Sequence, residues 1–339
     1  MKRLTLEKIA ELAGVSRATV SRVVNGHPNI RTEVRERVQK VIDETGYEPN
    51  RAARSLASNR SNIIGVFKPL VGGTDLFIDP YYPKLINGIS HECNQLDYVL
   101  SLFIFRNREE ERTKFNQIIN SGLVDGLILT ASVADDPYVP ILQKRGVPFV
   151  MVGRAPYDSS ASFIDADNIG GASTAASHLI RTGYKRIACI SPESRTTVGQ
   201  DRLGGFLKAF EDRQVPINRE LIVEGDFTFA SGVSAMRQLL PLKPDAVFAG
   251  SDAMALGAMQ AIQEAGLKVP DDIAVVGFDD FPAASNAVPP LTTIRQPVEE
   301  SGSMAVRTLV DMIDTESREA RGTILPVELI VRKSCGALR

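Results

Sequence analysis

The amino-acid sequence predicts an α/β protein in which two doubly wound lobes, each built on a parallel sheet, follow a small all-α domain. Three observations predict this architecture. The chain has 339 residues, enough for two or three domains that each bury a core. Residues 1–49 carry three short apolar stripes at helical spacing. From about residue 62 onward, short apolar runs alternate with amphipathic helical patterns, which is typical of parallel sheets covered by helices on both faces.

Three short helices are predicted in residues 1–49. The first follows Thr5 as its N-cap and ends at Gly14, the second follows Ser16, and the third is capped by Thr32 and ends at Gly46. Their apolar positions are Leu6, Ile9, Ala10 and Ala13, then Val20, Val23 and Val24, then Val34, Val38, Val41 and Ile42. The first two helices fit a helix-turn-helix, whose second helix enters the DNA major groove. From these residues alone, a generic three-helix bundle with an exposed polar face fits equally well.

The segment 50–58 lies between this head and the body. Asn50 can cap a helix there and three alanines favour one, but nine residues are too few for a stable helix alone in water. We therefore expect this segment to become ordered only when something packs on it.

The body contains seven apolar runs of strand length. They are residues 63–67, 99–103, 126–129, 149–152, 186–190, 246–249 and 273–277. Helical patterns between them are residues 83–96, 109–121, 170–182, 201–214, 231–240 and 253–265. Binding sites of such sheets lie at the carboxyl ends of the strands, so two lobes can share one cleft.

Composition and charge narrow the class of protein. Hydrophobic residues make up 43% and charged residues 24%, as in soluble globular proteins. Residues 1–60 hold twelve Lys and Arg against seven Asp and Glu, whereas the rest of the chain is acidic. This split indicates a head that binds a polyanion. The three cysteines lack disulfide or metal spacing, and no signal peptide or membrane span is visible, so we expect a cytoplasmic protein without a membrane partner.

Two segments of the head form a recognisable motif. They are Thr5-Leu6-Glu7-Lys8-Ile9-Ala10-Glu11-Leu12-Ala13-Gly14-Val15-Ser16-Arg17-Ala18-Thr19-Val20-Ser21-Arg22-Val23-Val24-Asn25-Gly26 and Thr45-Gly46-Tyr47-Glu48-Pro49-Asn50. In these segments the head resembles the lac repressor family of bacterial transcription factors. This resemblance implies a homodimer or tetramer that binds a pseudo-palindromic double-stranded operator. It also implies a periplasmic-binding-protein-like core that senses a small molecule. The implied domains are a headpiece (1–49), a hinge or linker (50–60) and a core (61–339). The core would have an N-lobe of about 61–162 and 293–322 and a C-lobe of about 163–292 and 323–339.

The resemblance assigns DNA contacts to residues of the head and the hinge. Arg17 and Ala18 take the positions that read base edges, where Arg17 can donate two hydrogen bonds to a guanine and Ala18 offers a methyl contact. Arg22 is the second base reader. Positions that anchor phosphates or fix the register are Thr5, Ser16, Thr19, Ser21, Asn25 and Asn29. In the hinge, which Asn50 begins, Leu56 would wedge into the minor groove, while Ala53 and Ala57 let two hinge helices approach each other.

The resemblance continues through the body. Its motifs are Ser251-Asp252-Ala253-Met254-Ala255-Leu256-Gly257-Ala258, Val275-Val276-Gly277-Phe278-Asp279-Asp280 and Pro289-Pro290-Leu291-Thr292-Thr293-Ile294. The implied effector cleft contains Tyr81, Tyr82, Arg154, Asp165, Arg202, Phe227, Ser251 and Asp279. Carboxylates, guanidinium groups and flat aromatic faces suit a polyol, so we expect a sugar or oligosaccharide. Thr196 and Thr197 leave a nucleobase or nucleoside open, and Ser251 stands where sugar-sensing relatives usually carry Asn.

Other functional classes have less support. The sequence contains no phosphate-binding loop, nucleophile elbow or HExxH motif, and His27, His91 and His178 are too scattered for a metal site or a catalytic triad. We therefore expect neither an enzyme nor a cofactor. A solute-binding protein of the periplasmic type is the alternative, but the head argues against it. The C-terminal residues 332–339 are too short for the heptad helix of family tetramers, so we expect a dimer.

Overall fold

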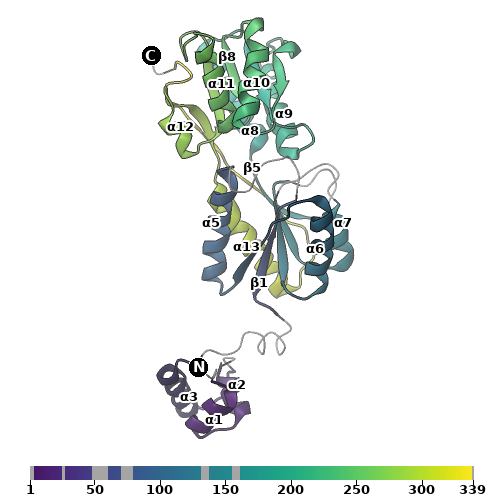
Figure 1. The fold of residues 1–339 in the computed structure, drawn as a ribbon, viewed down its shortest axis with the longest axis vertical. Helices are drawn as coiled ribbons and strands as arrows, with labels where there is room; N and C mark the ends of the chain where they lie inside the picture. The colour runs from purple at the N-terminus through teal and green to yellow at the C-terminus, as the bar shows by residue number, and fades with distance from the viewer. Residues whose placement is uncertain are drawn as a thin grey trace. The chain divides into compact units, whose positions relative to one another are not determined.

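The computed structural model describes residues 4–24, 27–47, 60–69, 79–130, 137–154 and 161–337 (Figure 1). The chain divides into two compact units, Met1–Asn62 and Ile63–Arg339. In the described ranges, none of the helices has the length and apolar character that a membrane span requires.

The first unit is a small three-helix domain. Its helices are α1 (Leu6–Ala13), α2 (Arg17–Val24) and α3 (Thr32–Thr45). They bury one apolar cluster of Ile9, Ala10, Ala13, Val20, Val23, Val38 and Tyr47. Gly14 and Gly46 end α1 and α3 with positive φ angles of 62° and 60°, a conformation that costs glycine little. The three predicted helices are therefore confirmed.

One predicted helix cap, Thr32, differs from the structure, and Thr5 is an N-cap by position only. The N-cap of α3 is Arg31, and Thr32 is the first helical residue. Thr5 occupies the N-cap position of α1, but its side chain makes no capping hydrogen bond. Its hydroxyl instead helps to lower the pKa of Glu7, after the larger contribution of a backbone hydrogen bond. Ser16 does cap α2, because its Oγ accepts a hydrogen bond of 3.1 Å from the Thr19 N–H.

The N-lobe is a six-stranded parallel sheet with helices on both faces. Its strands are β1 (Ile63–Phe67), β2 (Val99–Phe103), β3 (Gly126–Thr130), β4 (Phe149–Val152), β5 (Ser162–Ala166) and β11 (Gly322–Leu325), in the order β11-β5-β4-β3-β1-β2. Helices α5 (Tyr81–Gln95) and α13 (Val298–Thr315) lie on one face, and α6 (Arg108–Asn120) and α7 (Tyr138–Arg145) lie on the other (Figure 1). Alternate strand residues enter the two cores: Ile128 packs with α5 and α13, whereas Leu127 and Leu129 pack with α6 and α7.

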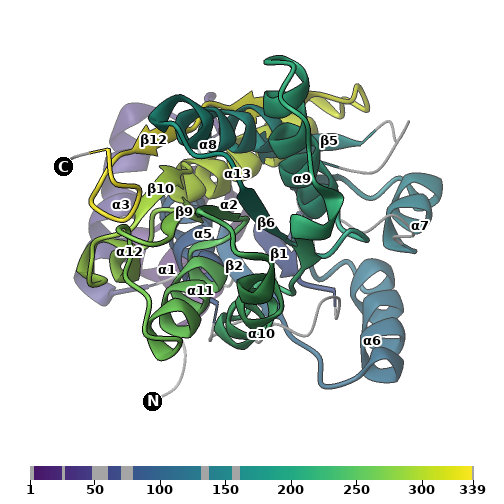
Figure 2. The same cartoon turned by 90° about the horizontal axis from the view of Figure 1, so that it is seen from above.

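The C-lobe repeats this architecture. Its strands are β6 (Ile187–Ser191), β7 (Ile222–Glu224), β8 (Ala246–Ala249), β9 (Ala274–Asp279), β10 (Thr292–Arg295) and β12 (Glu328–Ile330), in the order β12-β10-β9-β8-β6-β7. Only the pairing of β10 with β12 is antiparallel among these described strands. Helices α8 (Asn168–Thr182) and α9 (Thr197–Glu211) cover one face, and α10 (Phe229–Leu239) and α11 (Asp252–Glu264) cover the other (Figure 2). The short α12 (Pro282–Asn286) follows β9.

Three crossovers connect the lobes. They lead from β5 to α8, from β10 to α13 and from β11 to β12. The lobe boundaries expected near residues 162, 293 and 322 are therefore corrected, because each of them falls inside a strand. β5 and β11 belong entirely to the N-lobe, and β10 belongs entirely to the C-lobe.

Candidate functional site

The first candidate surface is the exposed face of α2. Arg17, Ala18 and Arg22 are exposed there, while Val20 and Val23 on the opposite side enter the core. The polar positions predicted to anchor phosphates are also accessible: Thr5, Ser16 and Asn29 are exposed, and Thr19 and Ser21 are half-buried. Asn25, Asn50, Ala53, Leu56 and Ala57 lie outside the described residues. This face is therefore polar and basic, as contact with a phosphate backbone requires.

Arg17 has an acidic partner within the head. Its Nε lies 2.9 Å from Glu7 Oε1, and the two side chains are 68% and 61% exposed. An exposed pair of this kind adds little to stability because water screens both charges. The pair with Glu7 therefore leaves the Arg17 guanidinium accessible, and base contact by Arg17 stays a prediction.

The second candidate site lies at the carboxyl ends of the strands in the larger unit and is centred on Arg202 of α9. This side chain is only 4% exposed. Its Nε donates to Asn168 Oδ1 at 2.9 Å, and its Nη1 donates to the Gly250 carbonyl at 2.6 Å and to Asp279 Oδ1 at 3.3 Å. The guanidinium carbon also lies 3.7 Å from the Phe278 ring centroid. These contacts with other parts of the protein fix the orientation of Arg202.

Asp279 ends β9 and shares this network. Its Oδ1 also accepts from Gln296 Nε2 at 2.6 Å, and its Oδ2 accepts from the Asp252 N–H at 3.3 Å. Burial raises the pKa of Asp279 to about 6, against the opposing effect of Arg202 and with an added raising effect of Asp79. Asp252 is a buried neighbour whose pKa is also raised by burial and by the charge of Asp279.

Asp165 brings the N-lobe into the same network. Its Oδ1 accepts from the Ala166 N–H at 2.9 Å and from Asn168 Nδ2 at 3.0 Å. Burial raises the pKa of Asp165 to about 6, and Asp201 contributes in the same direction. Because Asn168 bonds both Asp165 and Arg202, carboxylates from both lobes are joined through one amide.

Aromatic and charged side chains at the start of α5 form another part of the site. The rings of Tyr81 and Tyr82 meet edge to face, with centroids 5.4 Å apart. Lys68, which directly follows β1, places its Nζ 4.8 Å from the Tyr82 ring centroid. Asp79 accepts a 2.9 Å hydrogen bond from the Tyr81 N–H, and burial raises the pKa values of both Asp79 and Tyr81.

The side chain of Arg154, which belongs to the N-lobe, forms an ion pair with a residue of the C-lobe. Arg154 follows β4 of the N-lobe, and its Nη2 lies 2.5 Å from Asp201 Oδ1 on α9 of the C-lobe. Thr197 of α9 donates a 2.8 Å hydrogen bond to the Arg154 carbonyl. Arg154 therefore connects the lobes in addition to lying among the predicted effector residues.

Ser251 lies at the C-lobe edge of the site, whereas no contact described in the structure ties Phe227 to the network around Arg202. Ser251 is 2% exposed and caps α11, because its Oγ accepts from the Met254 N–H at 3.2 Å. It follows Gly250, whose carbonyl binds Arg202. Phe227 is half-buried in the loop before α10 and has a φ angle of 68°. The capping role limits Ser251 as a ligand contact, since its oxygen already accepts one hydrogen bond.

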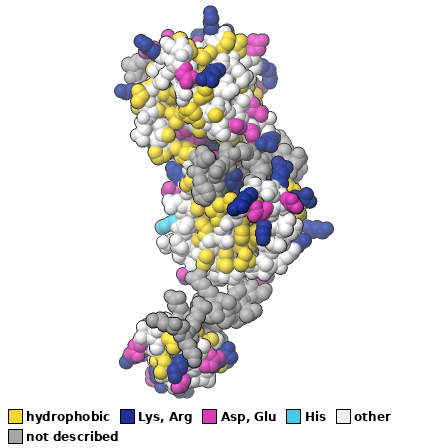
Figure 3. All heavy atoms as spheres, viewed as in Figure 1, with side chains coloured by type: hydrophobic (Ala, Val, Ile, Leu, Met, Phe, Trp, Pro, Cys, Tyr) yellow, Lys and Arg dark blue, Asp and Glu magenta, His cyan; other side chains and the backbone are white. Residues whose placement is uncertain are grey.

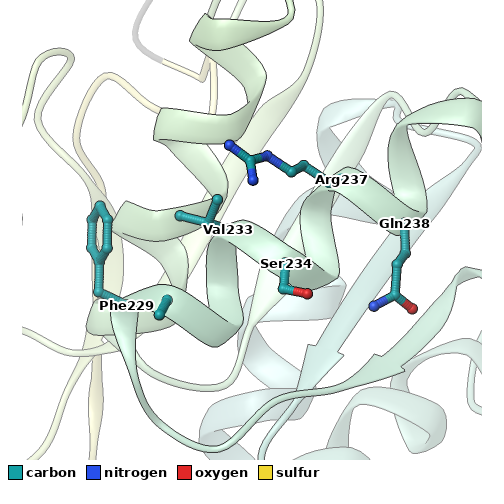
Figure 4. A pocket seen from close by; sticks show the side chains of 6 residues that line it. Phe229, Val233, Ser234, Arg237 and Gln238 are labelled. Carbon is teal, nitrogen blue, oxygen red and sulfur yellow. The ribbon is translucent and has the colours of Figure 1, made fainter.

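A separate hollow lies on the outer face of α10. Figure 4 shows its lining side chains, which are Phe229, Ala230, Val233, Ser234, Arg237 and Gln238. Arg237 is paired with Glu264 of α11 at 2.8 Å. None of the predicted effector residues lines this hollow, so the network around Arg202 remains the candidate for a small-molecule site.

Five polar residues of the network were absent from the sequence prediction. They are Lys68, Asp79, Asn168, Asp201 and Gln296. Lys68 and Gln296 each come directly after a strand, and Asn168 begins a helix after β5. Their place after strand ends is the signal that could have identified them. In the described ranges, no three His, Cys, Asp or Glu side chains are grouped so that they could hold a metal ion.

The sequence matches two known protein families. Residues 5–50 match the family described as bacterial regulatory proteins, lacI family, and residues 176–335 match the periplasmic binding protein-like domain. The HTH-type transcriptional regulator CelR of Thermobifida fusca is 39% identical over 337 residues, which is 98% of each chain. The ribose operon repressor of Escherichia coli K12 is 38% identical over 312 residues, or 91% of this chain and 93% of the repressor.

Solved structures of similar proteins have the same fold. A complex of the transcriptional regulator CelR with cellobiose has a TM-score of 0.77 and 37% identity, and the match covers 98% of this chain and 100% of that one. The lac repressor dimer bound to operator and the anti-inducer ONPF has a TM-score of 0.83 and 31% identity, with 98% and 99% coverage.

Proposed function

This chain belongs to the lacI family of bacterial regulatory proteins, and we propose that it is a dimeric, sugar-responsive repressor of a catabolic operon. DNA binding and transcriptional regulation follow from family membership, because the relatives are transcriptional regulators along nearly their whole length. As a regulator it works where the chromosome is, in the cytoplasm, and the relatives give no reason to assign it an enzymatic activity.

The observation that carries the sugar proposal is the network around Arg202. Buried carboxylates of Asp165 and Asp279 accept hydrogen bonds, Arg202 and the amides of Asn168 and Gln296 donate them, and tyrosine rings lie on α5. Closely spaced acceptors and donors beside flat aromatic faces suit a ring that carries many hydroxyl groups. The complex of CelR with cellobiose and the name of the ribose operon repressor support the same ligand class.

Two exposed apolar regions support a dimer. Leu96, Val99, Ile104 and Leu123 of the N-lobe expose 38–50% of their surface, and Figure 3 shows hydrophobic side chains gathered on one face of this lobe. In the C-lobe, Val288 is 82% exposed. The family resemblance implies dimer contacts through the helices near 83–96 and 109–121 and the segment around 278–290. The exposed positions lie in or close to these segments, and exposed apolar patches commonly mark protein interfaces.

A ligand screen of the purified protein tests the effector class. Cellobiose, ribose, α-glucosides, nucleobases and nucleosides are added one by one while the unfolding temperature is measured. A ligand that binds only the folded protein raises that temperature. We expect a sugar to do so in wild type and to lose most of its effect in Asp279→Ala. A response to a nucleobase alone would support the alternative regulator, and a response to sugar without any operator preference would support a solute-binding protein.

A further inference from the structure

We propose that Asp280 is a positioning residue, which holds the neighbouring effector carboxylate of Asp279 in place and ties it to the crossovers between the lobes. Only the sugar-binding test below depends on the proposed function. The side chain of Asp280 is held by two arginines that lie outside the network around Arg202.

The backbone at this point is in an unusual conformation. Asp279 and Asp280 both have positive φ angles, of 129° and 60°. Residues other than glycine rarely adopt such angles, which are strained and persist only where the surroundings hold them in place. Two in succession at the end of β9 therefore require a local restraint.

The side chain of Asp280 supplies that restraint. It is 6% exposed, and each of its oxygens binds a different arginine. Oδ2 lies 2.7 Å from Arg295 Nε, and Oδ1 lies 2.6 Å from Arg332 Nη2. Burial alone would raise the pKa of Asp280, but the hydrogen bonds from Arg332 and Arg295 outweigh it and lower the pKa, so the carboxylate is charged at neutral pH. Charge-assisted bonds of this length are the strong class of hydrogen bond.

Arg295 lies next to one interlobe crossover, and Arg332 follows the short strand that another crossover enters. Arg295 is the last residue of β10 and is followed by Gln296, which donates to Asp279 itself at 2.6 Å. Arg332 comes two residues after β12, the strand that the chain enters from the N-lobe strand β11. Arg332 is fixed in turn, because its Nη1 donates to the Leu291 carbonyl at 2.8 Å. A movement of either crossover would therefore shift Asp280, and with it the carboxylate that faces the effector.

The first test needs no sugar. Aspartate labelled with ¹³C at the carboxyl group is titrated by NMR in the unliganded protein, and the Asp279 signal is assigned by its loss in Asp279→Asn. In wild type we expect a midpoint near the raised pKa of about 6. Asp280→Gly removes the carboxylate that binds Arg295 and Arg332 and makes the backbone more flexible. In this variant the titration midpoint of Asp279 should fall toward the ordinary value of about 4, because water reaches its carboxylate. An unchanged midpoint in Asp280→Gly would overturn the proposal.

A matched control variant distinguishes the loss of the Asp280 carboxylate from the general effect of removing one negative charge near Arg295. Glu328→Gln removes the other acidic partner of Arg295, which lies 3.6 Å away and is 70% exposed. It should leave the Asp279 midpoint where it is in wild type. A shift in Glu328→Gln as large as that in Asp280→Gly would contradict the assignment to Asp280.

The second test measures sugar and operator affinity together. Asp280→Asn keeps the shape and tolerates a positive φ, so it removes mainly the charge. We expect it to weaken cellobiose binding about tenfold or more, with operator affinity in the absence of sugar unchanged. Arg295→Gln should weaken cellobiose similarly, and combining it with Asp280→Asn should add little. Equal sugar affinity of wild type and Asp280→Asn, or fully additive losses, would overturn the proposal. If wild type binds no sugar, the proposed effector class fails, and the NMR titration alone decides the role of Asp280.

Discussion

At the scale of single residues, Arg17 offers the most specific prediction about DNA. Its guanidinium lies on the exposed face of α2, and its partner Glu7 is a weak competitor because the pair is exposed. Replacing Arg17 with Ala should change which base is preferred at one position of each half-site, at a cost of about 1–3 kcal/mol for the preferred base. Binding to a set of operators with single-base changes measures this. A uniform loss across all of them would make Arg17 a phosphate contact.

The buried carboxylate of Asp165 leads to a prediction about how the free energy of unfolding depends on pH. Burial raises the pKa of Asp165 from 3.8 to about 6, so the ionised form destabilises the folded protein. This penalty is absent below the unfolded pKa and grows as pH rises through the folded pKa. Asp165→Asn keeps an acceptor for the Ala166 N–H and should therefore raise the unfolding free energy by about 1–3 kcal/mol at pH 8. The gain should vanish near pH 4 in denaturant titrations. A constant gain at both pH values would show that burial of the charge is not its cause.

The residues of the site show which part of it could be predicted. Asp165, Arg202 and Asp279 were predicted through resemblance, and the structure places them in one hydrogen-bonded network. Asn168 and Gln296 were missed although both follow strand ends, because that position does not by itself single out an amide. Their role depends on contacts between segments far apart in the chain. Whether the predicted residues bind the effector stays a prediction.

At the scale of elements, the ion pair between the loop after β4 and helix α9 links the two lobes. If Arg154 and Asp201 favour a closed cleft, Asp201→Asn should weaken sugar binding about three- to tenfold, since fewer molecules would be in the closed state. Isothermal titration measures that affinity. The exchanged pair Arg154→Asp with Asp201→Arg should restore most of it. If the exchange restores nothing, Arg154 contacts the effector directly instead.

The hinge segment gives a second prediction at this scale. Leu56→Gly should weaken operator binding at least tenfold, because the apolar wedge is lost and glycine disfavours the helix. Sugar binding by the body should be unchanged, which a thermal-shift titration of the same variant checks. Equal operator affinity of variant and wild type would refute the hinge interpretation of residues 50–58.

Elements differed in how well the sequence predicted them. Continuous apolar runs such as 63–67 and 149–152 were found at their observed bounds, because strands buried on both faces leave no room for polar residues. β5 and β10 were missed because they contain buried polar side chains. Thr293 of β10, for example, is fully buried only because it donates to Asp252 at 2.5 Å. The strands β7, β11 and β12 are short and partly exposed, so they carry little apolar signal.

At the scale of the whole molecule, the chain combines two units for which we propose different tasks. A basic head with an exposed polar face on α2 precedes a two-lobed body whose buried polar network spans both lobes. The fold class and the order of the units could be predicted because helical and strand periodicities change at one point in the sequence. The positions of the crossovers could not, because they depend on which sheet each short strand joins.

The most direct test of this account is the operator affinity of the full-length protein, measured by fluorescence anisotropy with and without a saturating sugar from the ligand screen. A duplex selected from random sequence serves as operator, and a scrambled duplex serves as control. We predict that the sugar changes the operator affinity at least about tenfold, a coupling of about 1.4 kcal/mol, and that Asp279→Ala binds the operator but does not respond. An operator affinity that is the same with and without every sugar that binds the body would contradict the account.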